Sequence, residues 1–426
     1  MLKRVKIQGY KSLVDVEVNL QPLSVLFGPN ASGKSNFLDA LQLLSRIATS
    51  SKLKDAFNYP YRGTPLESFT FGNDGIQGLL AKDSIIFSIE VDVELSQRAI
   101  DVANQQLQRA NDAANQQLKI VQNVKTTGDK SKIVREASIP LVQDKDWRYR
   151  VEVEFSPKTG SVRLARETIQ RLIDGNQPDD SSYGSYNSDI SIFAEPTFLA
   201  TFPDLLAIRE ELASWFFYYL EPRERMRIPG PVKEVRQIGM MGEELDAFLY
   251  TLRATNPTQF KAIEQALHMV VPSVTGIDVG VNNLGDLELR LMQGETPISS
   301  RVVSDGTLRT LGLLALTGVK DPPTLIGLEE PENGINPARI RLIALFLETR
   351  AMHNTQMIVT THSPVLTDLI PHESLFVCRR LKGNTIIEPY SVWEYPEMDV
   401  AFDDEEDLPE LTVSERILRG DFDAEH

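Results

Sequence analysis

The sequence GPNASGKS occupies residues 28–35, directly after the apolar run Leu23 to Phe27. A helical spacing of apolar residues follows it, between Ser35 and Ala48. A glycine-rich loop between a buried strand and a helix lets backbone N–H groups surround phosphate oxygens, because glycine permits a close approach of the backbone. This stretch therefore predicts a phosphate-binding loop in an α/β fold.

The residues of this loop are the first candidate ligands of ATP and Mg²⁺. Lys34 is expected to reach the β- and γ-phosphates, and the Ser35 hydroxyl is expected to bind Mg²⁺. We predict nucleotide contacts from nine consecutive residues: Gly28, Pro29, Asn30, Ala31, Ser32, Gly33, Lys34, Ser35 and Asn36.

Two later strand patterns end in side chains suited to the same site. The run Thr324 to Leu328 ends in EEPE, residues 329–332. Carboxylates at a strand end beside a phosphate loop can hold a metal and orient an attacking water. We therefore assign Mg²⁺ to Glu329 and the general base to Glu330. The next strand pattern ends at His362, which is expected to contact a γ-phosphate or to hold the catalytic water.

A second candidate anion site precedes these strands. Ser304, Asp305 and Gly306 open the helix-like run Leu308 to Thr317, so a hydroxyl and free backbone amides meet at a helix N-terminus. Because the chain already has one phosphate loop, these three residues are expected to close on the nucleotide of another copy.

The order of these four motifs resembles the ATP-binding-cassette (ABC) ATPases of the RecF, SMC and overcoming-lysogenization-defect (OLD) type. The resemblance implies a head-to-tail homodimer that holds two ATP molecules at its interface, with Ser304 and Gly306 acting in trans. It also implies that Glu330 is the base and His362 the γ-phosphate sensor. Glu329 stands where the family usually has aspartate, and Gln77 is only a weak match to the metal-contacting glutamine.

The resemblance and the hydrophobic patterns together predict an α/β chain: an ABC-type P-loop ATPase head with a mixed or parallel sheet, an antiparallel strand lobe, a helical insertion and a short helical arm. The expected segments are an N-terminal ATPase lobe (1–95), an inserted helical arm (96–146), antiparallel strands with a helical insertion (147–273), a C-terminal ATPase lobe (274–392) and an acidic tail (393–426).

Three segments between the lobes carry further expectations. From Ile100 to Val124 the apolar spacing fits both a projecting arm and an ordinary surface helix. Residues Asp174 to Asp189 are polar and without period, which predicts a mobile loop. Residues Leu205 to Leu220 have helical periodicity.

Composition restricts the classes of protein. A chain of 426 residues with 42% hydrophobic residues can bury a real core. The single cysteine, Cys378, excludes an internal disulfide, and the start of the chain does not resemble a signal peptide. The longest apolar runs are far shorter than the roughly 20 residues that cross a bilayer. We therefore expect a cytoplasmic protein without a membrane partner.

The net charge of −16 is concentrated at the C-terminal end, where Ser391 to His426 carry −11. The rest of the chain is nearly neutral, so DNA or RNA stays a candidate partner. One basic series fits contacts with nucleic-acid phosphates, and equally a solvated face paired with Glu221, Glu224 and Glu234. The series consists of Arg223, Arg225, Arg227, Lys233 and Arg236.

The acidic tail leaves three alternatives open. Residues Glu394 to Glu410 contain nine carboxylates and no base, so they are expected to be extended or disordered. Either they keep the protein soluble, or they compete with nucleic acid for a basic groove. The apolar residues within Leu411 to Phe422 suit a short helix that docks on an effector.

The favoured function is an ABC-type ATPase that hydrolyses Mg-ATP and acts as a switch on nucleic acid or on a separately encoded nuclease or other effector. Antiviral defence and DNA repair are the settings suggested by fold analogy. The alternative is the motor subunit of a membrane transporter, which the roughly 180 residues between the lobes disfavour. The 64 residues after His362 are too few for a nuclease domain. The homodimer is the expected assembly, with higher oligomers left open.

Overall fold

A computed structural model gives the fold of residues 1–72, 74–124, 141–142, 144–173, 175, 177–195, 199, 202–394 and 411–423. Its contacts divide the chain into two units. The first unit comprises Met1–Asn19 and Asp39–Trp215, and the second comprises Leu20–Leu38 and Phe216–His426. None of the described helices is long and apolar enough to cross a membrane. The five predicted segment boundaries stay predictions.

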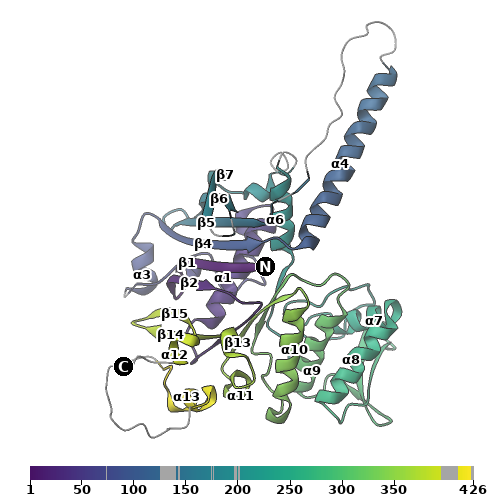
Figure 1. Cartoon of the computed structure of the whole chain (residues 1–426). Helices are drawn as coiled ribbons and strands as arrows, with labels where there is room; N and C mark the ends of the chain where they lie inside the picture. Colours follow the sequence, from purple (N-terminus) through teal and green to yellow (C-terminus); the bar gives the residue numbers. More distant parts are fainter. Residues whose placement is uncertain are drawn as a thin grey trace, which may run out of the picture. The chain divides into compact units, whose positions relative to one another are not determined.

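The first unit is built on a six-stranded antiparallel sheet with the order β2-β1-β4-β5-β6-β7 (Figure 1). Side chains alternate between buried and partly exposed along β5, as expected for a sheet with one covered face. The strands are β1 (Leu2–Tyr10), β2 (Leu13–Asn19), β4 (Ile85–Glu94), β5 (Asp146–Ser156), β6 (Ser161–Ile173) and β7 (Gln177–Ser188).

The last strand corrects the loop predicted for residues 174–189. β7 pairs with β6 in antiparallel register, with Ile169 opposite Tyr183 and Thr168 opposite Gly184. The edge of β6 offers backbone hydrogen-bond partners to a polar segment whose side chains alone do not favour a strand. Residues 174 and 176 lie outside the described part.

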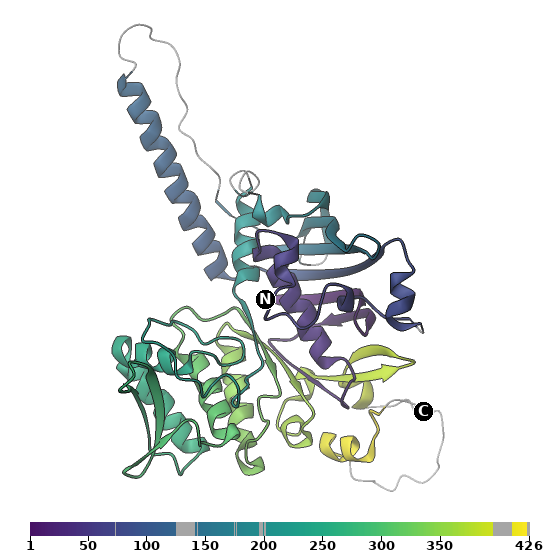
Figure 2. The ribbon, with the colours of Figure 1, turned by 180° about the vertical axis from the view of Figure 1, so that it is seen from behind.

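The arm is a single helix, α4 (Gln97–Val124), of 28 residues. At 1.5 Å per residue it is about 42 Å long. Its first turns pack on α6 (Pro203–Ala213) and bury Ile100, Ala103 and Leu107. The described side chains after Leu107 are exposed or half-buried, and Figures 1 and 2 show the helix extending away from the sheet. Among the described side chains of α4, only those near its base are therefore held by the first unit.

Shorter helices complete this part of the chain. They are α1 (Lys34–Thr49), whose first residues belong to the second unit, α2 (Leu53–Ala56), η1 (Leu66–Ser68), α3 (Gly75–Leu80) and η2 (Ile192–Ala194). The weak glutamine candidate, Gln77, lies exposed on α3.

The second unit has a mixed six-stranded sheet with the order β15-β14-β3-β13-β12-β8, and a three-stranded antiparallel sheet with the order β11-β10-β9. In the mixed sheet β12, β13, β3 and β14 are parallel neighbours, and β15 is antiparallel. Parallel and antiparallel pairing with interspersed helices confirms the predicted α/β class. The bounds are β3 (Leu23–Phe27), β8 (Trp215–Tyr218), β9 (Gly276–Val281), β10 (Leu287–Gln293), β11 (Thr296–Ser299), β12 (Leu325–Glu329), β13 (Gln356–Thr361), β14 (Leu375–Leu381) and β15 (Asn384–Pro389).

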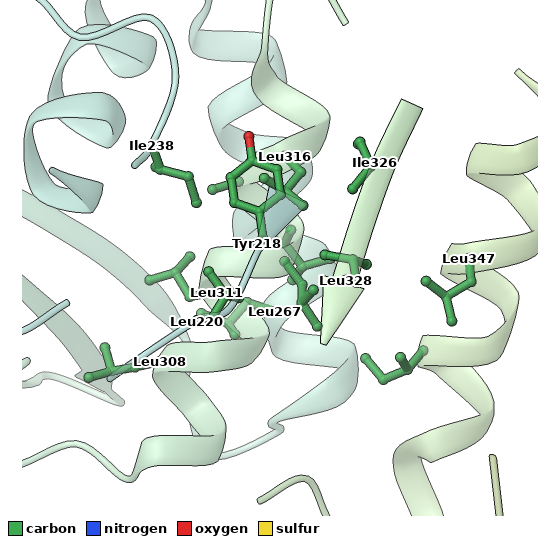
Figure 3. Close-up of a cluster of buried hydrophobic side chains, with 14 of the residues drawn as sticks. Tyr218, Leu220, Ile238, Leu267, Leu308, Leu311, Leu316, Ile326, Leu328 and Leu347 are labelled. Atoms are coloured by element: carbon green, nitrogen blue, oxygen red, sulfur yellow. The ribbon is translucent and has the colours of Figure 1, made fainter. Parts of the chain in front are cut away.

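The helices of this unit share one apolar core with the mixed sheet. Figure 3 shows side chains of β12, such as Ile326 and Leu328, among residues of the surrounding helices. The helices are α7 (Leu245–Thr255), α8 (Pro257–Val270), α9 (Asp305–Ala315), η3 (Leu316–Gly318), η4 (Pro337–Arg339), α10 (Ile340–Met352), α11 (Pro364–Thr367), η5 (His372–Ser374), α12 (Ser391–Glu394) and α13 (Val413–Arg419).

Two predictions for helical segments need correction. The helix predicted over Leu205 to Leu220 ends at Ala213, and four consecutive aromatic residues form β8 because such side chains suit a strand. The docking helix predicted near the C-terminus exists as α13, but its flanking Phe422 packs at 5.2 Å between ring centroids against Phe27. Its apolar residues Val413 and Phe422 are thus buried in this chain's own core. The acidic residues 395–410 lie outside the described part.

Candidate nucleotide site

Three neighbouring parallel strands bring the predicted motifs to one edge of the mixed sheet. β13 pairs with β3, with Thr361 opposite Phe27, and with β12, with Thr360 opposite Glu329. Since parallel strands end at the same edge, the phosphate loop, the glutamate turn and His362 all follow strand ends on that edge. The sequence predicted each motif, and the strand order brings the three together.

The phosphate loop has the backbone that its glycines predict. Gly28 has φ 145° and Gly33 has φ 108°, and Ala31 between them also lies at positive φ. A Cβ on Gly28 would lie 1.9 Å from the backbone oxygen of Cys378. Only glycine fits at that position without moving backbone.

A hairpin that the sequence motifs did not reveal holds the back of this loop. The Thr385 hydroxyl donates to the Ser32 carbonyl at 2.7 Å, and the Cys378 thiol reaches the same oxygen at 3.5 Å. Burial raises the pKa of Cys378 to about 11, so the thiol is neutral and structural. The apolar start of β14 and the turn at Lys382 and Gly383, both at positive φ, are the signal that could have found this hairpin.

Lys34 is a buried cation with carbonyl partners. Its side chain is 7% exposed, and Nζ donates to the carbonyl oxygens of Gly28 and Pro29 at 2.8 Å each. Burial lowers the pKa of Lys34, while the charge of Glu330 opposes this shift. A loop with two glycines at positive φ around a buried ammonium group fits a phosphate chain.

Two residues with oxygen donors that could hold Mg²⁺ adjoin the loop. Ser35 follows Lys34 at the start of α1, and Glu329 ends β12. Hydroxyl and carboxylate oxygens suit Mg²⁺, which in nucleotide sites takes its other ligands from phosphates and water. Among the described residues there is no cluster of three or more His, Cys, Asp or Glu side chains for a metal. The donors present therefore fit a metal that arrives with a nucleotide. Of the remaining predicted contacts, Asn30 is exposed and Asn36 is half-buried in the first turn of α1.

Glu330 and His362 form a direct pair. Glu330 has φ 45°, and its Oε1 lies 3.0 Å from Nδ1 of His362. The Asn333 amide donates to the other carboxylate oxygen at 3.4 Å. The strained turn thus presents a carboxylate that is oriented from two sides, as a general base requires.

Glu332 is a buried member of the same turn that the sequence interpretation passed over. Its side chain accepts a hydrogen bond from the Thr361 hydroxyl, and its residue exposure is 5%. Its Oε2 has no hydrogen-bond partner within the described part of the chain. Burial raises the pKa of Glu332. Because Thr361 directly precedes His362, this contact links the glutamate turn to the histidine strand.

The candidate signature is packed against the loop after the glutamate turn. The Ser304 hydroxyl caps α9 by accepting from Thr307 N at 3.2 Å. A Cβ on Gly306 would lie 1.9 Å from the Gly334 carbonyl oxygen. Arg309 donates to the Asn333 carbonyl at 2.5 Å. The structure therefore joins the signature to its own glutamate loop, and the hydrogen bonds of Ser304 stay within α9.

Asp305 is bound by two residues of the basic series. Arg223 and Arg227 each lie 2.7 Å from its carboxylate. Lys233 pairs with Glu244, and Arg236 with Glu234 at 2.9 Å. These four basic residues are therefore paired with carboxylates, which agrees with a solvated, paired face better than with an open phosphate-binding surface. The partners are mainly acids other than those predicted.

Comparisons with known proteins place these features in a family and a fold. Residues 23–368 match a family model described as "AAA domain, putative AbiEii toxin, Type IV TA system". No curated protein matches the chain. An SMC head crystallised with the C-terminal winged-helix domain of ScpA superimposes with a TM-score of 0.54 at 11% identity, covering 91% of this chain and 97% of that one. This likeness confirms the predicted ABC-type ATPase head fold.

Two further SMC heads have lower scores. The head domain from Thermotoga maritima gives a TM-score of 0.42 at 13% identity, over 91% of this chain and 98% of that one. The head from Pyrococcus furiosus with an extended coiled coil gives a TM-score of 0.47 at 10% identity, over 91% of this chain and 95% of that one.

Proposed function

The chain belongs to the AAA-domain family described as a putative AbiEii toxin of a type IV toxin–antitoxin system, and on this premise we propose that it hydrolyses Mg-ATP within a head-to-tail homodimer. The observation that carries the proposal is the shared sheet edge, where the Lys34 loop adjoins the paired Glu330 and His362. A phosphate cradle beside an oriented base and a histidine is the set of groups that nucleotide hydrolysis needs.

In the proposed reaction Glu330 accepts a proton from a water molecule as the water oxygen forms a bond to the γ-phosphorus. The bond between that phosphorus and the β–γ bridging oxygen breaks, which leaves ADP and phosphate. Lys34 offsets charge on the phosphate oxygens, and His362 orients the carboxylate through its 3.0 Å contact. Bound by Ser35 and Glu329, Mg²⁺ would offset further phosphate charge.

The state of the signature supports a site shared between two copies. Ser304 is exposed at the N-terminus of α9, and its hydrogen bonds remain within that helix. An exposed helix N-terminus attracts an anion, and the phosphate of a second copy's nucleotide is the partner that the ABC-type arrangement implies. Ser304, Asp305 and Gly306 are therefore proposed to act in trans.

We propose further that nucleotide-driven dimerisation controls a separate effector, in antiviral defence or DNA repair. The similar SMC head is described as bound to a domain of ScpA, which supports action through a partner protein. Direct contact with nucleic acid has less support, because the basic series is mostly paired.

Single substitutions test the nucleotide site. Lys34→Ala removes the phosphate-facing charge and should abolish nucleotide binding, whereas Glu330→Gln should bind ATP without releasing phosphate. Glu373→Gln, at an exposed carboxylate, is the matched control and should keep full turnover. Normal phosphate release by Glu330→Gln would rule out this residue as the base.

Mixing two inactive variants tests the dimer. A Lys34→Ala chain and a Ser304→Arg chain together make one intact composite site per mixed dimer. Random pairing of equal amounts should restore about one quarter of wild-type turnover if the two sites act independently. Leu284→Arg, at a residue 87% exposed, is the control for a bulky surface cation. Turnover that stays at zero after mixing would contradict a shared site.

A further inference from the structure

Helix α10 has two apolar stripes. The first is buried in the core and consists of Ile340, Ile343, Ala344 and Leu347. The second repeats the same spacing two residues later on the other side of the helix, at Leu342, Leu345, Phe346 and Thr349. A helix that is apolar on two sides is normally covered on both. The second stripe therefore indicates a surface that is covered in the working protein.

The second stripe forms one wall of an open groove in the second unit. The last turn of α8, with Ala266 and Met269, and the end of α9, with Leu314, form the other walls. Figure 1 labels these three helices. The volume of about 460 Å³ lies in the range of binding sites.

One charged side chain in this groove lacks an acceptor. Arg350 lines the groove from the last turn of α10, and its buried Nε and Nη2 atoms have no hydrogen-bond partner within the described residues. Burial lowers the pKa of Arg350. Arg350 as a whole is half-buried and pairs with no described carboxylate, so an acidic group that enters the groove would offset its charge.

The other polar groups of the groove are already bonded. The hydroxyl of Thr349 donates to the Leu345 carbonyl at 2.7 Å. The ring of His353 lies 2.6 Å from the Thr349 carbonyl. The groove therefore offers apolar walls and one half-buried cationic side chain.

We propose that this groove docks an amphipathic helix of a partner protein, whose apolar stripe fills the groove and whose Asp or Glu carboxylate accepts hydrogen bonds from Arg350. Helix-in-groove recognition reads residues at i, i+3, i+4 and i+7, the same spacing that the second stripe presents. The Arg350 guanidinium, which lines the groove, is complementary to a carboxylate in charge. The inference deepens the proposed function, because the partner is then the effector.

The extent of the apolar surface favours a helix over a small ligand. Met269 is 59% exposed, Leu345 is 57% exposed and Met352, beside the groove, is 79% exposed. A ligand confined to the groove would leave Met352 in water, whereas a helix lying along α10 covers Met352 together with the two lining side chains.

The position of the groove favours a different protein over a second copy. The groove lies at the C-terminal end of α9, and the signature lies at the N-terminal end of the same 11-residue helix, about 16 Å away. The proposed head-to-tail dimer uses the signature end, so the groove stays free for another protein.

Synthetic peptides test this surface on the full chain. The probes are 18-residue helical peptides with leucine at i, i+3, i+4 and i+7 and one Glu scanned beside the stripe, each matched with a peptide that has Gln instead. Fluorescence anisotropy should show at least one Glu peptide binding about tenfold more tightly than its Gln partner. Arg350→Gln should remove this difference, and Leu345→Glu should weaken both peptides. Val392→Glu, at a residue 62% exposed, is the control.

The outcomes separate this inference from the proposed function. Equal affinity of the Glu and Gln peptides at every position overturns the inference, as does an Arg350→Gln chain that keeps the difference. Dodecanoate binding with the same dependence on Arg350 overturns it in favour of a small amphiphile. Loss of self-association in Leu345→Glu overturns it in favour of a second copy. Arg350→Gln should fold and hydrolyse ATP at the wild-type rate. If the wild-type chain shows the peptide effect but does not hydrolyse ATP, only the proposed function is refuted.

Discussion

Replacing Gly306 by alanine tests the contact between the signature and the loop after the glutamate turn. An added Cβ would lie 1.9 Å from the carbonyl oxygen of Gly334 and 2.6 Å from the carbonyl carbon of the same residue. Cβ atoms in real structures essentially never come closer than 3.0 Å to such atoms. The obstructing atoms are backbone, so no side chain can rotate away. Helix α9 and the Gly334 loop must separate by about 1 Å to admit the methyl group.

Overpacking of this kind costs about 1–3 kcal/mol. For a unit of this size, that loss should lower the melting temperature by about 2–12 °C. Gly230→Ala is a matched control in the same unit, because its Cβ would meet only the Asp246 carboxylate, at 3.9 Å. It should change stability by less than about 0.5 kcal/mol.

Differential scanning fluorimetry of both variants without nucleotide gives the comparison, and urea unfolding provides the free energies. The reasoning concerns packing alone, so it does not depend on hydrolysis or on dimerisation. If Gly306→Ala has the same melting temperature as the wild type and Gly230→Ala, α9 does not approach Gly334 as closely as described.

Three other predictions follow from the site. Arg227→Gln should lower the free energy of unfolding in urea by about 1–3 kcal/mol, because Arg227 is largely buried and bonded to Asp305. Arg223→Gln should change it by less than about 0.5 kcal/mol, because that side chain is 76% exposed. Equal effects of the two substitutions would contradict this difference between the two ion pairs. Burial raises the pKa of Cys378 to about 11, so this thiol should resist iodoacetamide at pH 8 in the folded chain and react in denaturant. Mass spectrometry measures the labelling, and rapid labelling of the folded chain would contradict the burial of Cys378. Burial also raises the pKa of Glu332, so the folded chain keeps a proton that the unfolded chain releases, and stability is lost as the pH rises through the raised pKa. As the pH rises from about 5 to about 8, the melting temperature of Glu332→Gln should therefore fall less than that of the wild type. Parallel plots of melting temperature against pH would contradict a raised pKa of Glu332.

Local patterns in the sequence predicted the strand ends and loops well, because their signals lie within a few residues. The phosphate loop and the helix start at Ser304 each depend on neighbours in the chain. What the sequence could not provide are contacts between distant residues. The brace from Thr385 to Ser32 joins positions 353 residues apart, and the contact from Glu332 to Thr361 joins positions 29 apart.

The errors have the same physical origin. β7 consists largely of polar residues and forms a strand because β6 offers it an unpaired edge. Val413 and Phe422 suggested an external docking face, but they are buried in the second unit. Apolar spacing shows that a helix has a face to cover, whereas only the tertiary structure shows whether the chain covers it itself. It covers Val413 of α13 and the neighbouring Phe422, whereas it leaves Leu345 of α10 57% exposed.

The contacts around Asn333 suggest how two shared sites would communicate. Asn333 donates to Glu330 through its side chain and accepts from Arg309 of the signature helix through its carbonyl. Gly306 and Gly334 are in backbone contact beside it, so the proposed catalytic carboxylate and the candidate signature of one chain are parts of one packed cluster. In the proposed dimer these two groups serve different nucleotides. A shift of Glu330 during hydrolysis at one site would then move the signature that closes the other, because close-packed backbone transmits displacement. Coupling of this kind predicts that Arg309→Gln leaves ATP binding intact but makes phosphate release depend less steeply on ATP concentration than in the wild type. An unchanged steepness with normal folding would show that the two sites act independently.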